Sequence, residues 1–369
     1  MMNFARLLLL PGQTNSLSGL FESDWNYGRA IHFSFPQDLI QQFHAQVTPE
    51  AAPSILWQQG VVSAADNAIS ADWRFELYNL GTITNRLFLT LAEGGHVTDG
   101  RYAITGSAYA DEVHNAGRIE GLINLAEGDD LLDGRNGVML GAADGGAGND
   151  TLLSGAAAET LLGGEGLDWL DGGDGTDSLA GGAGSNKIFG GGGNDYLTAE
   201  DGQDQLDGGA GDDWAFGDRG DDKLTGGEGA DTLIGGDGDD TLSGGAGDDL
   251  IEAWDDRDSV SGGDGNDTIS AWGGGDHLFG DAGDDLIDVI GGSFTLSGGA
   301  GADTVSVWDG WVANDMLDGG DGDDYLNAGA GDDTLLGAGG ADTMLGGAGD
   351  DVILLGDSSL QDILRLFAL

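Results

Sequence analysis

The chain repeats a nine-residue phrase, and this period constrains its fold more than any other feature. From Gly145 the period holds in phase for eighteen repeats to Ser306, and after a three-residue insertion five more repeats run from Gly310 to Leu354. A repeat such as GGAGND (145–150) opens with Gly-Gly, has a third glycine at position four and carries Asp at position six. Position eight is nearly always Leu, Ile or Val. So short and regular a period predicts stacked, equivalent turns of a solenoid.

The residue types within each repeat predict which part turns and which part pairs. Glycine adopts positive φ and permits close backbone approach, so positions one to six can form a tight turn whose carbonyls face inward. Positions seven to nine can form a short strand whose middle side chain points into the interior. Two strands and two turns, or two nine-residue repeats, close one coil. We therefore expect an all-β fold: a right-handed parallel β-roll, or β-helix, of stacked nonapeptides.

Carboxylates dominate the charge of the chain. With 66 Asp and Glu against 12 Lys and Arg, the formal net charge is −54. Position six is Asp in 20 of the 23 repeats, the exceptions being Glu159, Asn186 and Phe294. Carboxylates stacked about 5 Å apart on neighbouring coils repel by about 3 kcal/mol per pair at an effective dielectric constant of about 20. This composition excludes nucleic acid as a direct partner, because phosphate binding requires Lys and Arg. It indicates hard cations, and an all-oxygen site with about six to eight ligands matches Ca²⁺.

The pattern GGxGxDxUx, where U is a large aliphatic residue, is a known calcium-binding repeat of parallel β-helices. Twelve of the 23 repeats match GGxGxD outright, among them GGEGLD (163–168), GGEGAD (226–231) and GGAGDD (346–351). Residues 145–354 therefore resemble the RTX (repeats-in-toxin) haemolysin-type calcium-binding repeat family.

The resemblance implies several Ca²⁺ ions between successive turns on the same edge of the roll, held by turn carbonyls and the position-six Asp, with folding coupled to binding. The metal ligands that it assigns are Asp150, Asp168, Asp177, Asp195, Asp204, Asp213, Asp222, Asp231, Asp240, Asp249, Asp267, Asp276, Asp285, Asp303, Asp324, Asp333, Asp342 and Asp351.

The two edges of the predicted roll differ in sequence. Successive repeats alternate between edges, so position-six residues of one edge lie eighteen residues apart. On the first edge, which runs from Asp177 to Asp324, eight of nine turns begin with Gly-Gly. The second edge begins well at Asp150 and Asp168 but then carries Asn186 and Phe294 at position six. Turns of the second edge also open with Ala-Glu, Gly-Asp, Ala-Trp or Val-Ile instead of Gly-Gly. We predict a continuous calcium row on the first edge and an interrupted row on the second.

A column of apolar residues accompanies the weaker edge. The segments LIEAWD (250–255), TISAWG (268–273), LIDVIG (286–291) and TVSVWD (304–309) recur with the eighteen-residue spacing. Alternation along a strand that continues past position nine would turn Ile251 and Ala253 inward. It would turn the following column outward: Trp254, Trp272, Ile290 and Trp308, with Trp311 nearby. The column could bind a glycan, a surface polymer or a protein. Alternatively, another segment covers it, or it tightens the sheet by cross-strand stacking.

The composition predicts four regions. Residues 1–104 hold only 8 of the 73 glycines and are expected to form an N-terminal mixed β cap. Residues 105–144 are expected to be transitional coils and residues 145–354 the calcium-binding roll. Residues 355–369 form a C-terminal cap, or the C-terminal signal that family members present to a type I exporter. The apolar stretch near the N-terminus is shorter than the hydrophobic region of a secretory signal peptide. We therefore expect export through a type I exporter.

Other functional classes lack their motifs. There is no Cys, no HExxH, no GxSxG and no P-loop, and no apolar run approaches the roughly 20 residues of a membrane-spanning helix. Acid pairs at Glu22/Asp24 and Asp72/Glu76 leave an unrecognised catalytic region within residues 1–104 as one alternative. We predict a non-enzymatic, secreted calcium-binding protein, located outside the cell or associated with its surface, whose roll folds on binding Ca²⁺. The other alternative is an adhesin or glycan-binding protein that uses the tryptophan column.

Overall fold

The protein is described by a computed structural model. It describes the backbone of residues 96–106, 108–308 and 312–356 and of short strands outside them, and the side chains of residues 103–106, 108–308 and 312–356. The chain divides into an N-terminal unit, Met1–Gly146, and a C-terminal unit, Ala147–Leu369.

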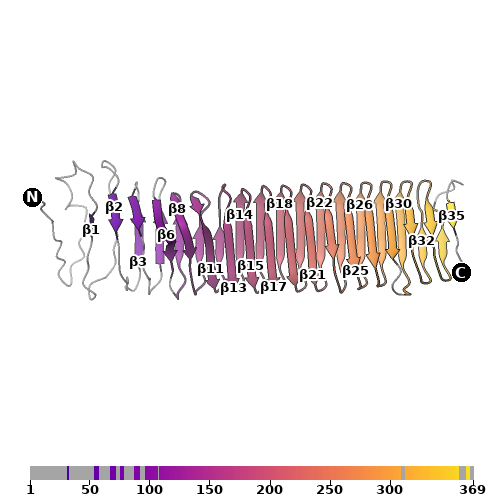
Figure 1. Cartoon of the computed structure of the whole chain (residues 1–369), viewed down its shortest axis with the longest axis horizontal. Helices are drawn as coiled ribbons and strands as arrows, with labels where there is room; N and C mark the ends of the chain where they lie inside the picture. The colour runs from indigo at the N-terminus through magenta and orange to yellow at the C-terminus, as the bar shows by residue number, and fades with distance from the viewer. Residues whose placement is uncertain are drawn as a thin grey trace, which may run out of the picture. The chain divides into compact units, whose positions relative to one another are not determined.

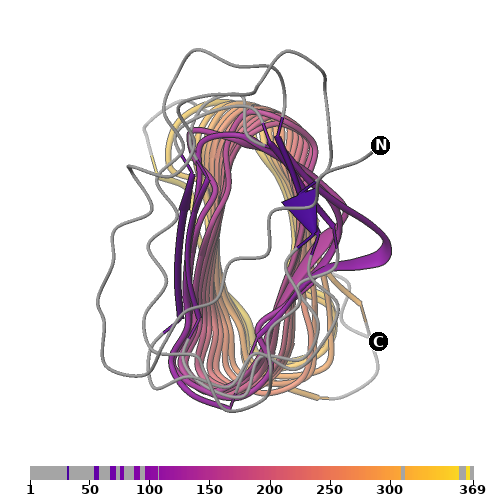
Figure 2. The same ribbon diagram turned by 90° about the vertical axis from the view of Figure 1, so that its left-hand side faces the viewer.

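The C-terminal unit consists of two parallel β-sheets that the chain visits in turn. In Figure 2 the two walls of strands face each other and are joined by turns, and in Figure 1 the strands follow one another in chain order. The odd sheet contains β13 (Thr160–Glu165), β15 (Ser178–Ala183), β17 (Tyr196–Asp201), β19 (Trp214–Arg219), β21 (Thr232–Asp237), β23 (Leu250–Ala253), β25 (Thr268–Trp272), β27 (Leu286–Ile290), β29 (Thr304–Trp308), β31 (Tyr325–Asn327), β33 (Thr343–Leu345) and β35 (Ile363–Arg365). The even sheet contains β12 (Thr151–Leu153), β14 (Trp169–Asp174), β16 (Lys187–Gly192), β18 (Gln205–Ala210), β20 (Lys223–Glu228), β22 (Thr241–Ala246), β24 (Ser259–Asp264), β26 (His277–Ala282), β28 (Thr295–Ala300), β30 (Met316–Asp321), β32 (Thr334–Leu336) and β34 (Val352–Leu354).

The strand register confirms the predicted coil. In the even sheet Leu224 of β20 pairs with Leu242 of β22, and in the odd sheet Leu233 of β21 pairs with Ile251 of β23. Each pair is one coil, or two nine-residue repeats, apart, and the strands run parallel. Among the residues that the structure describes there is no helix. The predicted all-β parallel roll is therefore correct.

The core of the roll is the column of position-eight side chains, as predicted. Leu170, Leu179, Ile188 and Leu233 are fully buried. Neighbouring positions seven and nine face outward and are at least partly exposed, because successive side chains of a strand point to opposite faces. One aliphatic residue per repeat makes this core narrow, so the turns must contribute much of the stability.

The three-residue insertion leaves the stacking intact. Leu296 of β28 pairs with Leu317 of β30 across 21 residues instead of 18. The backbone N–H of Asp303 donates to Asp324 Oδ1 across the same 21-residue interval, so the position-six column continues. The insertion therefore lengthens one coil without changing which residues face inward.

The described strands of the N-terminal unit also pair in parallel. One set is β1 (Ile31–His32), β2 (Ser54–Trp57), β4 (Phe75–Tyr78), β6 (His96–Thr105), β8 (Arg118–Asn124), β10 (Val138–Leu140) and β11 (Ala142–Ala147), and the other is β3 (Asn67–Ala71), β5 (Leu87–Leu91), β7 (Glu112–Asn115) and β9 (Leu131–Asp133). Partners here are farther apart in sequence: Phe88 pairs with Glu112 and His96 with Arg118, 24 and 22 residues apart. The connections in residues 1–95 lie outside the described residues, so the predicted cap and the domain boundaries stay predictions.

Near the C-terminus, β35 pairs in parallel with β33, with Met344 opposite Leu364. This pairing adds one strand to the odd sheet beyond the last full repeat, which is compatible with the predicted C-terminal cap. No helix within the described residues is long and apolar enough to cross a membrane.

Candidate calcium-binding turns

The predicted position-six ligands lie inside the turns. Of the eighteen, all but Asp351 are buried, with no more than 3% of the residue exposed. They lie directly before the strands, because the glycine-rich turn ends where the strand begins. Burying so many carboxylates is costly unless a proton, a donor or a cation accompanies each of them.

One oxygen of each carboxylate belongs to a hydrogen-bonded ladder along each edge. On the first edge the backbone N–H of Asp213 donates to Asp231 Oδ1, and that of Asp231 donates to Asp249 Oδ1, both at 2.7 Å. On the second edge the N–H of Asp222 donates to Asp240 Oδ1 at 2.8 Å. Each Asp thus holds the turn of the preceding coil, which fixes the stacking of turns as well as of strands.

The ladder includes residues that sequence reasoning left out. Asp258 Oδ1 accepts the N–H of Asp240, and Asp315 Oδ1 accepts the N–H of Phe294, both at 2.8 Å. Both are position-six residues of repeats without Gly-Gly, and their phase alone would have identified them. In the N-terminal unit, Asp130 Oδ1 accepts the N–H of Asp111 in the same manner.

The second oxygen of these carboxylates is left without a donor. Within the described residues, Oδ2 has no hydrogen-bond partner at buried position-six residues of both edges: Asp168, Asp177, Asp195, Asp204, Asp213, Asp222, Asp231, Asp240, Asp249, Asp258, Asp267, Asp276, Asp285, Asp303, Asp324 and Asp333. A buried acceptor without a donor costs about 1–3 kcal/mol, and more when it is charged.

A backbone carbonyl lies beside the unpartnered oxygen. A Cβ built on Gly172 would lie 2.5 Å from Asp177 Oδ2 and 2.7 Å from the carbonyl oxygen of Gly190, one coil on. On the second edge, a Cβ built on Gly217 would lie 2.5 Å from both Asp222 Oδ2 and the carbonyl oxygen of Gly235. Position-one glycine therefore leaves open a space that is bordered by a carboxylate oxygen and by a carbonyl oxygen of the next coil. An all-oxygen environment of this kind fits Ca²⁺.

No group of three or more His, Asp or Glu side chains is placed to hold a metal ion within the residues described. The oxygens near position-one glycine are one carboxylate oxygen and one main-chain carbonyl, as at Gly172 and Gly217. This combination agrees with the mixture of side-chain and carbonyl ligands that the family resemblance implies.

Burial favours carboxyl groups that are protonated or whose negative charge is compensated by a cation. Burial raises the pKa of Asp177, Asp213 and Asp240 to about 7 and that of Asp258 to about 8. A backbone N–H donor from the preceding coil lowers each pKa, and neighbouring carboxylates raise it. Without a cation, the folded turns therefore retain protons that a solvated Asp would release well below neutral pH.

The second edge deviates where the sequence predicted it would. Phe294 is buried at position six and brings no oxygen ligand, although its N–H continues the ladder. At position one, the buried side chains of Ala253, Ala271 and Val289 stand where other turns have glycine. The Asp turns of this edge nevertheless present the same unpartnered oxygen as those of the first edge, and occupancy of the two calcium rows stays a prediction.

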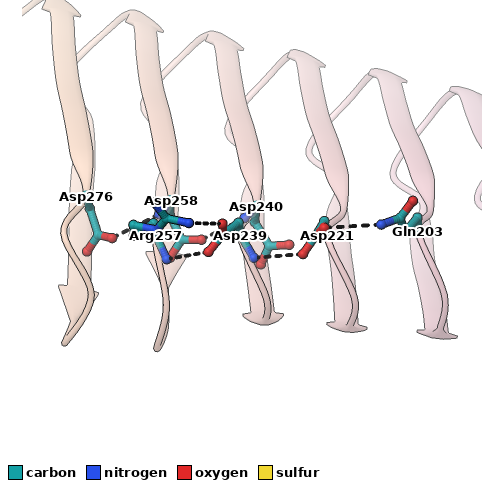
Figure 3. Close-up of polar contacts among 7 residues, drawn as sticks. All are labelled: Gln203, Asp221, Asp239, Asp240, Arg257, Asp258 and Asp276. Atoms are coloured by element: carbon teal, nitrogen blue, oxygen red, sulfur yellow. Dashed lines mark hydrogen bonds and ion pairs between the residues drawn. The ribbon is translucent and has the colours of Figure 1, made fainter.

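A second ladder, at position five, runs along the outside of the turns. Figure 3 shows it on the second edge, where the N–H of Asp239 donates to Asp221 Oδ1 and the N–H of Arg257 donates to Asp239 Oδ1. The Arg257 guanidinium also bonds Asp239 Oδ2 at 2.9 Å, and the Gln203 amide bonds Asp221 Oδ2 at 3.1 Å. Its direction is opposite to that of the position-six ladder, because here the side chain accepts from the following coil. The recurrence of Asn and Asp at position five was the available sequence signal.

The outward apolar column is present as predicted. Trp254, Trp272, Ile290 and Trp308 are exposed by 38%, 38%, 45% and 57%, whereas Ile251 and Ala253 are buried. Ile290 pairs with Trp272 on one side and with Trp308 on the other. Trp311 lies outside the described residues.

Other aromatic rings continue this face over earlier strands of the odd sheet. Tyr196 and Trp214 stack with ring centroids 4.4 Å apart, and Phe216 lies 6.1 Å from Trp254. Carboxylates flank the indoles: the Trp308 Nε1–H donates to Asp288 Oδ1 at 3.3 Å. The face is therefore an aromatic strip on a strongly acidic surface.

A model of a known protein family matches the repeats of this chain. The family model described as the RTX calcium-binding nonapeptide repeat (4 copies) matches residues 143–170, 153–188, 180–215, 216–251, 255–287, 295–311 and 318–353, which together make up more than half of the chain. Among solved structures the chain is similar to a hyperactive, Ca²⁺-dependent, beta-helical antifreeze protein from an Antarctic bacterium. That similarity has 22% sequence identity and a TM-score of 0.41, and covers 71% of this chain and 84% of that chain. No curated protein matches.

Proposed function

Because the chain belongs to the RTX calcium-binding nonapeptide repeat family, we propose that it is a secreted protein whose roll folds by binding Ca²⁺ outside the cell. It is a calcium-binding β-roll protein with several calcium ions. The ligands in this proposal are the predicted position-six Asp residues, together with Asp258 and Asp315. The observation that carries it is the unpartnered Oδ2 repeated through both edges.

The proposed mechanism links location to folding. At submicromolar calcium the repeats stay unfolded and pass through a type I exporter, for which residues 355–369 serve as the signal. Outside the cell, where extracellular calcium modules bind with dissociation constants of about 10⁻⁴–10⁻³ M, Ca²⁺ drives folding by mass action. The role is structural or binding, without catalysis, and the folded roll remains free or attached to the cell surface.

Limited proteolysis at buffered calcium concentrations tests this mechanism. We expect the chain to be degraded throughout at submicromolar calcium, whereas at millimolar calcium residues 145–354 should remain as a resistant fragment. Mass spectrometry of the fragments locates the protected region. Equal resistance at the two calcium concentrations would refute folding on export.

We propose glycan or surface-polymer binding by the tryptophan column as a second candidate function. Aromatic faces stack on apolar faces of sugar rings, and the carboxylates beside Trp254 and Trp308 can accept hydrogen bonds from hydroxyl groups. Neutral glycans avoid the repulsion that an anionic ligand would meet at a chain of net charge −54.

The double variant Trp254→Ala/Trp272→Ala is expected to lose binding on a glycan array while retaining its calcium-dependent circular dichroism. Truncating exposed rings removes contact area from the ligand without opening the core. Phe279→Ala is the matched control, since Phe279 is comparably exposed, at 37%, on the even sheet. If the chain binds no glycan, or if the double variant and Phe279→Ala weaken binding equally, this second function is wrong.

A further inference from the structure

Asn186 marks a turn that differs chemically from its neighbours. It is the position-six residue of the turn GGAGSN (181–186), and it lies between Asp168 and Asp204 on the second edge. Like an Asp, it takes part in the ladder: the N–H of Asp168 donates to Asn186 Oδ1 at 2.9 Å. This hydrogen bond determines the orientation of the amide, because only the oxygen can accept from an N–H.

The Asn186 amide nitrogen consequently stands where an Asp has its unpartnered oxygen. A Cβ built on Gly181 would lie 2.6 Å from Asn186 Nδ2, and a Cβ built on Gly163, one coil earlier, would lie 2.5 Å from Asp168 Oδ2. The two atoms occupy equivalent places in equivalent turns. One is a donor with two hydrogens, and the other is an acceptor.

The donor is used fully. Asn186 Nδ2 donates to the carbonyl oxygens of Gly182 and Gly184, at positions two and four of its own turn, both at 3.1 Å. By the equivalence of the turns, Oδ2 of a position-six Asp faces the same two carbonyls as a third acceptor. Three acceptors without a hydrogen between them need a cation, whereas the amide supplies two hydrogens of its own.

We propose that the Asn186 side chain takes the place of a calcium ion, so that the turn 181–186 closes without metal. This inference rests on the proposed function, in which position-six carboxylates bind Ca²⁺. It adds that the turn at Asn186, which interrupts the row of calcium sites, has its polar groups hydrogen-bonded without a metal ion. In the folded roll this turn holds the neighbouring coils through the ladder without binding an ion of its own.

Counting the calcium ions bound by three variants tests whether the Asn186 amide takes the place of an ion. Asn186→Asp restores the acceptor and is expected to bind at least one calcium ion more per chain than the wild type, by elemental analysis after equilibrium dialysis. The reciprocal Asp231→Asn, in the complete GGEGAD turn, is expected to bind at least one fewer and still fold. Asn194→Asp is the control for charge, because Asn194 is an exposed position-five acceptor to which an Asp is equivalent.

The outcomes separate the two proposals. A wild type that binds no calcium defeats the proposed function. A wild type that binds calcium, with an unchanged count in folded Asn186→Asp, defeats the amide substitution alone. If Asn186→Asp does not fold, Asp231→Asn decides: a full calcium count in that variant contradicts the inference, and a reduced count with native circular dichroism supports it.

Discussion

In excess chelator at neutral pH, we expect the roll to lose its strand structure completely and to regain it when calcium is restored. Leaving one partner of a buried ion pair uncompensated costs about 3–5 kcal/mol, and a whole domain is stable by only about 5–15 kcal/mol. Asp177, Asp213 and Asp240 alone would therefore exhaust the stability of the fold. Far-UV circular dichroism measures the loss, and Mg²⁺ should not reverse it, because Mg²⁺ requires a small octahedral site and keeps its waters. An unchanged strand spectrum in chelator would contradict the expectation.

The pH dependence of the calcium-free chain provides a second arm of this experiment. Burial raises the pKa of Asp177 from 3.8 to about 7, so the folded form binds more protons than the unfolded form between these values. The stability that this proton contributes is complete below about pH 4 and is lost as the pH rises through about 7. Calcium-free protein should thus regain part of its strand signal near pH 5, where protons replace the cation. If the strand signal of the calcium-free protein instead rises towards neutral pH, this expectation is wrong.

Gly229→Ala is expected to destabilise the folded roll by about 2 kcal/mol or more, since Ala at a positive φ is strained and must also displace its neighbour. Gly229 has φ +132°, and a Cβ there would meet the carbonyl oxygen of Gly211 and lie 2.5 Å from its carbonyl carbon. The backbone of the preceding coil has no flexible side chain to move aside. The calcium concentration at half-folding should rise, but by less than the roughly tenfold per 1.4 kcal/mol of a single site, because the several ions that bind on folding share the loss.

Gly192→Ala is the matched control for this prediction. Gly192 is also a turn glycine of the first edge, but its φ lies outside the left-handed region and a Cβ would come no closer than 3.4 Å to Asp174 Oδ1. Its calcium titration should coincide with that of the wild type. Equal shifts in the two variants would show that loss of glycine in general, rather than the contact with Gly211, causes the effect.

Most of the roll could be predicted because its information is local and periodic. Leu170 and Ile188 lie in the core since position eight is the only regularly apolar position. The outward direction of Trp254 and Trp272 followed from alternation along a strand. The N-terminal unit was harder to predict because its coils differ in length: Phe88 pairs with a residue 24 positions on and His96 with one 22 positions on, and no fixed period records such offsets.

The candidate site was predicted in composition but not in arrangement. Position six identified the carboxylates, yet the predicted ligands left out Asp258 and Asp315, which occupy the same position of the repeat. The roles of the two carboxylate oxygens were also beyond prediction. In Asp231, Oδ1 accepts a backbone N–H while Oδ2 has no partner, and two chemically identical oxygens acquire different roles only when a particular coil lies next to them.

The nine-residue period by itself determined the coil, its narrow core and the residues that can bind calcium, because these depend only on residue type and spacing. Tertiary structure decided which atoms are satisfied. Asn186 and Asp168 occupy the same position of the repeat, and in both an N–H of the preceding coil donates to Oδ1. This contact between coils leaves the Asn186 amide nitrogen against two carbonyls of its own turn and leaves Asp168 Oδ2 unpartnered. The physical reason is that a hydrogen bond depends on distance and direction between atoms of neighbouring coils, which exist only after the register has formed.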